Sequence, residues 1–198
     1  MKILVLAEIN NGELAEDQTS KTVSAATTLG KVDVLCASNK CGDASEKLAK
    51  MENVENVLVL EDDLFAQSLA ESYSETLVDT ISAYSHVFAP SSSFGKNILP
   101  RVAAMLDVMM VSDIIEVIDK ETFKRPIYAG NAIQTVKSND KIKVLSIRTA
   151  SFETSSEDGN AELVKLDKDS ENNLSKWIED KVDTSDRPEL TSAKVVVS

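Results

Sequence analysis

Apolar and polar positions in the first half of the chain form short continuous apolar runs separated by helical patterns. The apolar runs are Ile3–Ala7, Val32–Ala37, Val54–Leu60 and His86–Ala89. Continuous runs of this length are typical of strands that are covered on both faces of a parallel sheet. Because a stretch long enough for a helix separates each run from the next, the pattern predicts an α/β fold with a doubly wound, mostly parallel sheet.

Three helices are expected between these four strands. The first extends from about Asp17 or Thr19 to Leu29, after a polar loop over Glu8–Glu16. The second covers Asp43–Met51, with Asp43 as its N-cap, since an aspartate can accept a hydrogen bond from the free amides of a first helical turn. The third covers Leu64–Tyr84, where apolar residues recur every four positions.

The stretch Val87–Asp113 has the form of a strand, a loop, a helix and a second strand, which starts near Val108. The loop lies where open α/β sheets bind their ligands, at the carboxyl end of a strand. Pro100 follows within the helical pattern, and a proline inside a helix costs roughly 3 kcal/mol. We therefore expect this helix to begin near Asn97, which places Pro100 in its first turn, rather than at Ser93.

The pattern changes after Asp119. The strand-like runs Thr122–Ala129, Ala132–Lys137 and Ile142–Arg148 are separated by turn signals, and no helix fits between them. We interpret them as an antiparallel extension of the parallel sheet. Pro126 indicates an edge or a bulge within this extension, because proline has no amide hydrogen to donate.

The last part of the chain is more polar. Glu153–Asn173 is rich in acidic residues, serine and asparagine and is expected to be a surface linker. A short helix is expected around Leu174–Val182, docked by Trp177, and Lys194–Val197 has the form of a new strand. The expected organisation is an α/β domain over 1–150, a linker with a short helix over 151–193, and the first residues of a further domain over 194–198.

Composition excludes several classes of function. The chain has 198 residues and a net charge of −12, so it repels phosphate backbones and anionic membranes. Its two cysteines, Cys36 and Cys41, and its single histidine, His86, are too few for a zinc site. Two free thiols in a reducing compartment are expected, with a redox role for this pair as the last-ranked alternative. No window approaches the roughly 18 apolar residues of a membrane span.

Two groups of residues could carry chemistry. Ser91, Ser92, Ser93, Gly95 and Lys96 offer hydroxyls, backbone amides and a cation at a helix start, which can bind the phosphate of a nucleotide. The spacing matches neither the P-loop nor G-x-G-x-x-G, and the same residues are ordinary turn and capping residues.

The second group is Arg101 with Asp107 and Asp113, for which partly buried ion pairs or helix-end charges are the expected role. A single histidine supports no catalytic triad or dyad, and neither catalytic residues nor a metal site are expected.

Several segments together resemble a known family. SSSFGKNILPRVAAMLDVMMVSDI (91–114), YAGNAIQTVKS (128–138), KVLSIR (143–148) and SDRPELTSAKVVVS (185–198), with the opening KILVLAE, are similar in order to the alpha subunit of electron-transfer flavoprotein. The resemblance covers essentially the whole chain. It implies a Rossmann-like domain of the adenine-nucleotide-hydrolase type.

The resemblance also implies a function. Electron-transfer flavoprotein is a heterodimer that carries one FAD, with an AMP in its beta subunit, and it passes electrons from acyl-CoA and related dehydrogenases to a quinone oxidoreductase. The FAD-binding positions of the family lie beyond Ser198, so FAD is not expected on this chain alone. We expect a non-catalytic scaffold that packs on the beta subunit through Thr122–Arg148 and the arm around Trp177. Its expected location is the bacterial cytoplasm, or the mitochondrial matrix after removal of a leader.

Overall fold

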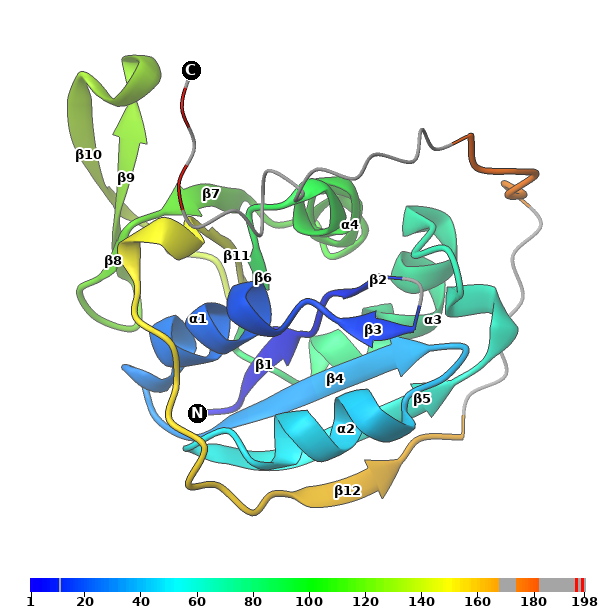
Figure 1. Ribbon diagram of the computed structural model, residues 1–198. Coiled ribbons are helices and arrows are strands. Elements are labelled where there is room, and N and C mark those ends of the chain that lie inside the picture. Colours follow the sequence, from blue (N-terminus) through cyan, green and yellow to red (C-terminus); the bar gives the residue numbers. More distant parts are fainter. Residues whose placement is uncertain (11, 168–173, 182–194, 196, 198) are drawn as a thin grey trace.

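A seven-stranded parallel sheet forms the centre of the computed structural model, which describes residues 1–10, 12–167, 174–181, 195 and 197 (Figure 1). The strand order is β12-β5-β4-β1-β6-β11-β7, and each strand is parallel to its neighbours. The chain builds outward from β1 in both directions, so the sheet is doubly wound. The predicted fold class is confirmed. In sheet order, the strands are Glu162–Lys165 (β12), Val54–Glu61 (β5), Val32–Ser38 (β4), Ile3–Leu6 (β1), His86–Pro90 (β6), Lys143–Ile147 (β11) and Met110–Ile114 (β7).

Helices cover both faces of this sheet. On one face, α1 (Glu16–Thr27) and α2 (Gly42–Ala49) form a core with Ile3 and Val5 of β1. On the other face, α3 (Ala70–Ser82) and α4 (Ser93–Met105) form a core with Leu4 and Leu6. Successive side chains of β1 therefore enter opposite cores, and both faces of the strand are apolar for that reason.

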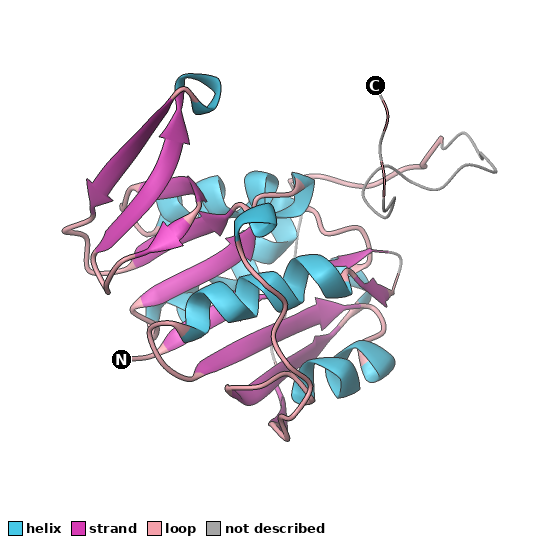
Figure 2. Cartoon of the chain, turned by 60° about the vertical axis from the view of Figure 1, so that its left-hand side comes forward, coloured by secondary structure: helices cyan, strands magenta, loops and turns pink. Residues whose placement is uncertain are grey.

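A separate three-stranded sheet projects from the β7 side of the molecule (Figure 2). It consists of β8 (Glu116–Val117), β9 (Thr122–Ile127) and β10 (Ala132–Lys137), and β9 and β10 form an antiparallel hairpin closed by the 3-10 turn Tyr128–Gly130 (η2). β8 pairs with only Phe123 and Lys124 of β9. Pro126 therefore has a strand partner on one side only, and the expectation of an edge at this residue is confirmed.

The orientation predicted for the third run of this region was wrong. Ile142–Arg148 forms β11, which lies between β6 and β7 and is parallel to both. Its residues Val144–Ile147 are buried on both faces, as in the first four strands. The turn signal at Ser138–Asp140 marks the return of the chain to the amino end of the main sheet and does not close a third antiparallel strand.

The fourth helix begins earlier than the sequence indicated. It starts at Ser93, and Pro100 lies inside it. Because Pro100 is exposed, water can bind the Lys96 carbonyl oxygen that receives no amide hydrogen from the proline. The expectation of a later start at Asn97 was therefore wrong. A tight packing contact at Gly95, described below, fixes the earlier start.

Three other predicted boundaries also differ. The loop Glu8–Glu16 contains a small hairpin of β2 (Ile9–Asn10) and β3 (Glu13–Leu14), and α1 starts at Glu16. Asp43 lies in the first turn of α2 and is not its N-cap, which is Cys41. The third helix starts only at Ala70, after the 3-10 turn Asp63–Phe65 (η1), since Ser68 has a positive φ of 48° that ends the turn.

The segment predicted as a linker is tied to the domain. After the 3-10 turn Thr149–Ser151 (η3), residues 152–161 cross the face that carries α1 and α2, and β12 then pairs with β5. We call residues 152–161 the strap. Ser155 N donates to Ser20 Oγ at 2.9 Å, and Gly159 N donates to the Lys50 carbonyl at 2.8 Å. The strap thus carries the chain from one side of the sheet to its opposite edge.

The helix predicted around Leu174–Val182 was also wrong for residues 174–181, which contain no helix. Trp177 is 41% exposed, and its Nε1 donates to Asp180 Oδ1 at 3.1 Å. Val182 and most of the strand predicted at Lys194–Val197 lie outside the described residues. The division of the chain at residues 150 and 193 stays a prediction.

Candidate functional site

The predicted nucleotide loop lies at the carboxyl end of β6, at the point where the sheet order reverses. Gly95 fixes its shape, because a Cβ atom at this position would lie 1.9 Å from the carbonyl oxygen of Pro90. The first turn of α4 therefore packs directly against the end of β6. Gly95 allows this close approach of helix and strand and is not free to wrap a ligand.

Ser91 connects two strands of the sheet. Its Oγ donates to Ser146 Oγ at 2.7 Å, and its backbone N donates to the carbonyl of Ile147 at 2.8 Å. Ser146 Oγ in turn accepts a hydrogen bond from the backbone N of Asp113 at 3.0 Å. These bonds hold together the carboxyl ends of β6, β11 and β7, so Ser91 has a structural role.

Ser92 is the N-cap residue of α4, but its side chain does not cap the helix. Its Oγ donates to Glu8 Oε2 at 2.6 Å, and Glu8 Oε1 accepts from Asn10 Nδ2 at 3.2 Å. Glu8 follows β1 and is only 7% exposed. A carboxylate of the chain thus lies at the crevice between β1 and β6, where nucleotide-binding folds of this class hold phosphate.

Ser93 and Lys96 lie on the solvent side of the loop. Ser93 is exposed at the first position of α4. The Lys96 side chain is 57% exposed, and its Nζ lies 3.7 Å from Asp113 Oδ1. The structure therefore does not bring the five predicted residues together around one cavity. Glu8 and Ser146 complete the actual network, and neither has a sequence pattern that could have identified it.

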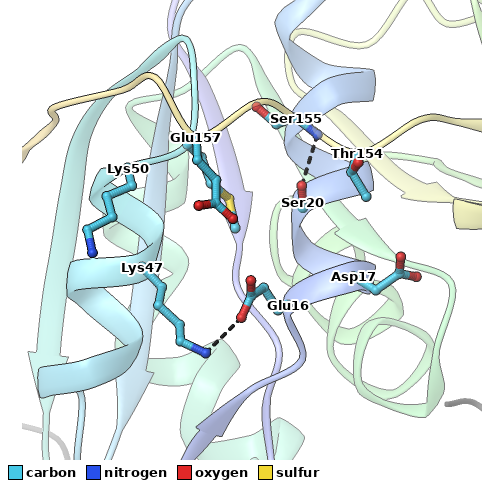
Figure 3. A pocket seen from close by; sticks show the side chains of 9 residues that line it. Glu16, Asp17, Ser20, Lys47, Lys50, Thr154, Ser155 and Glu157 are labelled. Carbon is cyan, nitrogen blue, oxygen red and sulfur yellow. Dashed lines mark hydrogen bonds and ion pairs between the residues drawn. The ribbon is translucent and has the colours of Figure 1, made fainter.

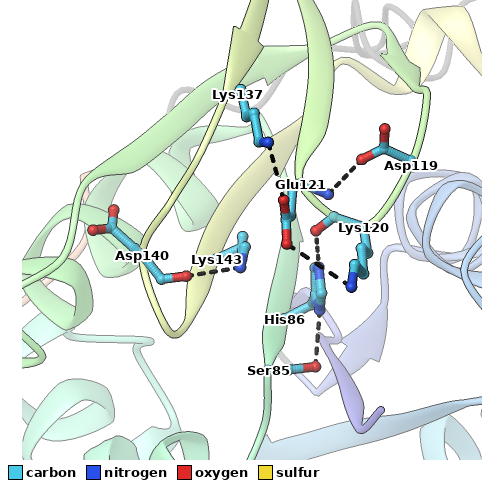
Figure 4. A network of polar contacts seen from close by, with 8 residues as sticks. All are labelled: Ser85, His86, Asp119, Lys120, Glu121, Lys137, Asp140 and Lys143. Atoms are coloured by element: carbon cyan, nitrogen blue, oxygen red, sulfur yellow. Dashed lines mark hydrogen bonds and ion pairs between the residues drawn. The ribbon is translucent and has the colours of Figure 1, made fainter.

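His86 is buried at the amino end of the same strand. Its Nε2 lies 2.7 Å from the carbonyl oxygen of Lys120, and its Nδ1 lies 2.9 Å from Ser85 Oγ (Figure 4). Because a carbonyl only accepts, the proton of the neutral ring is on Nε2, and Ser85 can donate to Nδ1. Burial lowers the pKa of His86. The ring therefore connects β6 to the loop at the base of the hairpin, in a structural role.

The charged residues considered with Arg101 do not form one cluster. Arg101 Nη2 lies 3.3 Å from Glu75 Oε1, which joins α4 to α3. Asp113 faces Lys96, and Asp107 lies just after α4 with a positive φ of 53°. The expected role as ion pairs and helix-end charges is confirmed for Arg101, Asp113 and Asp107.

The two cysteines are free and buried, Cys36 in β4 and Cys41 before α2. A hydrogen bond shared with Cys41, together with burial, raises the pKa of the Cys36 thiol. Both side chains are at most 1% exposed, so neither thiol is accessible to a redox partner.

A groove between α1, α2 and the strap has a volume of about 540 Å³ (Figure 3). Glu16 and Lys47 neutralise each other across it, with 2.7 Å between Oε2 and Nζ. Its carboxylates belong to α1 and the strap and its ammonium groups to the α2 side, so opposite charges face each other across the groove (Figure 3). It is lined by Glu16, Asp17, Ser20, Lys47, Lys50, Met51, Thr154, Ser155 and Glu157.

The described part of the chain contains neither a metal-binding cluster nor a helix that could span a membrane. It contains no group of three or more His, Cys, Asp or Glu side chains that could hold a metal ion. Its helices also lack the length and apolarity that a bilayer span requires.

Comparison with known proteins identifies the family. The electron transfer flavoprotein domain matches residues 3–171. The chain is 49% identical over 198 residues to the electron transfer flavoprotein subunit alpha of Paracoccus denitrificans, covering all of this chain and 64% of that protein. It is 44% identical to the subunit alpha of Pseudomonas aeruginosa, with the same coverage. It is 44% identical to the mitochondrial subunit alpha of Dictyostelium discoideum, covering 98% of this chain and 60% of that protein.

The match is therefore continuous through the α/β domain and includes the segments quoted from the sequence. The chain spans 60–64% of the length of these three relatives, which corresponds to their amino-terminal portion. The resemblance inferred from sequence is confirmed: this chain belongs to the electron transfer flavoprotein family, and the relatives that it matches are alpha subunits.

Proposed function

We propose that this domain is a non-catalytic scaffold of an electron transfer flavoprotein alpha subunit and that it packs on a beta subunit. The whole heterodimer would carry one FAD, with an AMP in the beta subunit. It would shuttle electrons from acyl-CoA and related dehydrogenases to a quinone oxidoreductase, in the bacterial cytoplasm or the mitochondrial matrix. In this proposal the FAD contacts come from residues outside this chain.

The observation that carries the proposal is the internal bonding of the loop at the carboxyl end of β6. Ser91 and Ser92 donate to Ser146 and Glu8, and the Glu8 carboxylate lies beside the start of α4. A phosphate placed there would meet a negative charge and would have to replace two hydrogen bonds. The position that binds ligands in related folds thus supports the fold in this chain.

The hairpin provides the first candidate contact surface for the beta subunit. Tyr128 at its tip is 80% exposed, and Ile133 on its outer strand β10 is 55% exposed. Large exposed apolar side chains on a projecting element are typical of protein contact surfaces. The edge of β10 that faces away from β9 also has no strand partner among the described residues.

The arm around Trp177 provides the second candidate surface. Leu174 and Ile178 are 65% and 82% exposed on either side of Trp177. The arm borders a hollow of about 380 Å³ against η1 and the start of α3. The two surfaces correspond to the interface candidates proposed from sequence, Thr122–Arg148 and the arm around Trp177. The Lys143–Ile147 part of the first candidate is excluded, because it is buried in the main sheet as β11.

Binding to a purified electron transfer flavoprotein beta subunit tests the scaffold proposal. We expect the folded chain to form a complex on size-exclusion chromatography, and Ile133→Lys to weaken it at least about tenfold, since a central apolar contact often contributes more than 1 kcal/mol. Leu163→Lys is the matched control, because Leu163 is 48% exposed on β12, far from the hairpin. Absence of a complex with the folded chain, or equal loss in both variants, would contradict the proposal.

The alternative is a nucleotide-binding module that uses Ser91, Ser92, Ser93, Gly95 and Lys96. The location of this loop at the reversal point of the sheet favours it. AMP and inorganic phosphate are titrated in parallel, while the backbone amides of residues 91–97 are followed by NMR. The scaffold proposal predicts that AMP binds no more tightly than inorganic phosphate, because the loop does not contact the adenosine group. Tighter binding of AMP than of phosphate, with shifts of these amides, would establish the alternative instead.

A further inference from the structure

A positively charged pocket lies between the start of α4, the ends of β7 and β11, and the hairpin. It has a volume of about 590 Å³, which is within the usual range of small-molecule sites. Lys96, Arg125 and Arg148 contribute to its walls, and Asp113 is its one carboxylate. The pocket thus gathers three cations and one anion in a chain whose net charge is −12.

The two arginines of this pocket have no ion-pair partner in the described part of the chain. Neither Arg125 nor Arg148 has a carboxylate oxygen of a described residue within 4.0 Å. The Nε of Arg125 is buried, and none of the described residues provides a hydrogen-bond acceptor for it. A buried donor without an acceptor is unfavourable, and most such groups in folded proteins are bonded to protein, water or ligand.

The backbone around the pocket holds these side chains in place. Arg125 lies in β9 and pairs with Gln134 of β10. The backbone N of Arg148 donates to the carbonyl of Ile114 at 2.9 Å, which fixes the end of β11 against β7. The β9–β10 pairing and the bond from Arg148 N to β7 therefore fix the backbone from which both arginine side chains extend, so binding of a ligand does not require the backbone to be ordered there.

The charge and the donors define the ligand chemistry. Guanidinium groups bind carboxylate and phosphate oxygens through paired N–H donors, and Lys96 adds a third positive charge. Pro126, Ile127 and the exposed ring of Tyr128 form the side of the pocket that belongs to the hairpin. This wall can contact the organic part of a ligand, while the cations hold its acidic group.

We propose that this pocket binds a small organic anion through a phosphate or carboxylate group, with Arg125 and Arg148 as its main ligands. The site is distinct from the internally bonded hydroxyls of Ser91 and Ser92. The proposal goes beyond the scaffold function and does not depend on it, since binding is measured on this chain without a beta subunit.

NMR titration of the 198-residue chain tests the proposal. The probes are inorganic phosphate and citrate, at constant ionic strength set with sodium chloride, and the reporter is the Arg125 Nε–H resonance. We expect saturable shifts of this resonance with at least one probe. Phosphate and citrate serve as separate arms, so their relative affinity identifies the preferred acidic group.

Variants with opposite expected effects complete the test. Arg125→Gln and Arg148→Gln should each weaken binding at least about tenfold, because each removes charge-assisted hydrogen bonds. Asp113→Asn should strengthen it about threefold or more by removing the negative charge. Asn tolerates the positive φ of 56° at this position, so the backbone is expected to be preserved.

Arg101→Gln is the matched control. Arg101 also has a buried Nε without an acceptor, but its guanidinium is paired with Glu75 on another face. The affinity of the Arg101→Gln variant for both probes should equal that of the unchanged chain. The proposal is overturned if the Arg125 Nε–H resonance responds neither to phosphate nor to citrate, each added at millimolar concentration in roughly 20-fold molar excess over the chain. It is also overturned if Arg125→Gln and Arg148→Gln bind both probes as tightly as the unchanged chain.

Discussion

Two polar regions lie side by side at the start of α4 and differ in how their polar groups are bonded. In the loop Ser91–Asn97, the first two hydroxyls bond to Glu8 and Ser146. In the neighbouring pocket, Arg125 and Arg148 have no carboxylate partner among the described residues. The loop has the sequence expected of a ligand site, whereas the pocket has the unsatisfied groups expected of one. Internal bonding, rather than residue type, thus distinguishes the polar cluster of the loop from the proposed anion site.

The largest expected effect concerns the packing of the loop. Gly95→Ala should destabilise the chain by about 3 kcal/mol or fail to fold, because the added Cβ would collide with the Pro90 carbonyl. Gly42→Ala is the control, since its Cβ would have nothing within 4 Å. Urea unfolding measures both variants. If Gly95→Ala were as stable as Gly42→Ala, the loop would not depend on the close contact between α4 and β6. The loop would then be no more rigidly packed than the neighbouring pocket.

The next effect concerns the carboxylate beside the loop. Glu8→Ala should lower the free energy of unfolding by about 2 kcal/mol, because the buried Glu8 carboxylate is lost as the acceptor of the part-buried donors Ser92 Oγ and Asn10 Nδ2. Glu16→Ala removes an exposed ion pair with Lys47 and should cost less than about 1 kcal/mol. Chemical denaturation distinguishes them. Equal losses would mean that the Glu8 contact is no stronger than a surface pair.

A pH-dependent effect is expected at the other end of β6. Burial lowers the pKa of His86 in the folded chain, so below the ordinary histidine pKa of about 6.5 the unfolded chain binds more protons than the folded one. The free energy of unfolding should therefore fall as the pH drops below that value. His86→Gln should lose less stability than the unchanged chain between neutral pH and pH 5. Parallel pH profiles of the two proteins would contradict this prediction.

The smallest effect is expected in the pocket. Arg148→Gln should change the free energy of unfolding by less than about 0.5 kcal/mol, and the change should be an increase, because the substitution reduces repulsion with the other cations. Thermal unfolding in chloride buffer checks this expectation. A loss comparable to that of Glu8→Ala would show that Arg148 supports the fold, and the contrast between the two regions would no longer hold.

The sequence predicted the elements that depend on local pattern. The four apolar runs became buried strands, and the doubly wound class followed from their alternation with helices. The position of β11 could not be predicted in the same way, because strand direction depends on which partner the strand finds. The same limit applies to β12, whose polar sequence resembles a linker and whose main-chain bonds to β5 do not require apolar side chains.

The candidate site was predicted less well than the fold. The residue types in Ser91–Lys96 were compatible both with phosphate binding and with ordinary turn and capping roles, and the sequence did not decide between them. The choice depended on Glu8 and Ser146, which are 84 and 55 residues from their serine partners in the sequence. Contacts over such separations are set by topology and leave no local pattern. The pocket residues are also far apart in the sequence, since Lys96 lies in α4, Arg125 lies in β9 and Arg148 follows β11.

The pairing of β12 with β5 also has a consequence for synthesis of the chain. Asn56 is opposite Glu162, so the edge of the sheet at β5 stays open until more than a hundred further residues have been made. A nascent chain that has emerged only through β11 would expose an unpaired strand edge, which is prone to association with other chains. Because the strap and β12 close this edge late, we expect a truncation before Glu162 to aggregate more readily than the chain that includes Lys165.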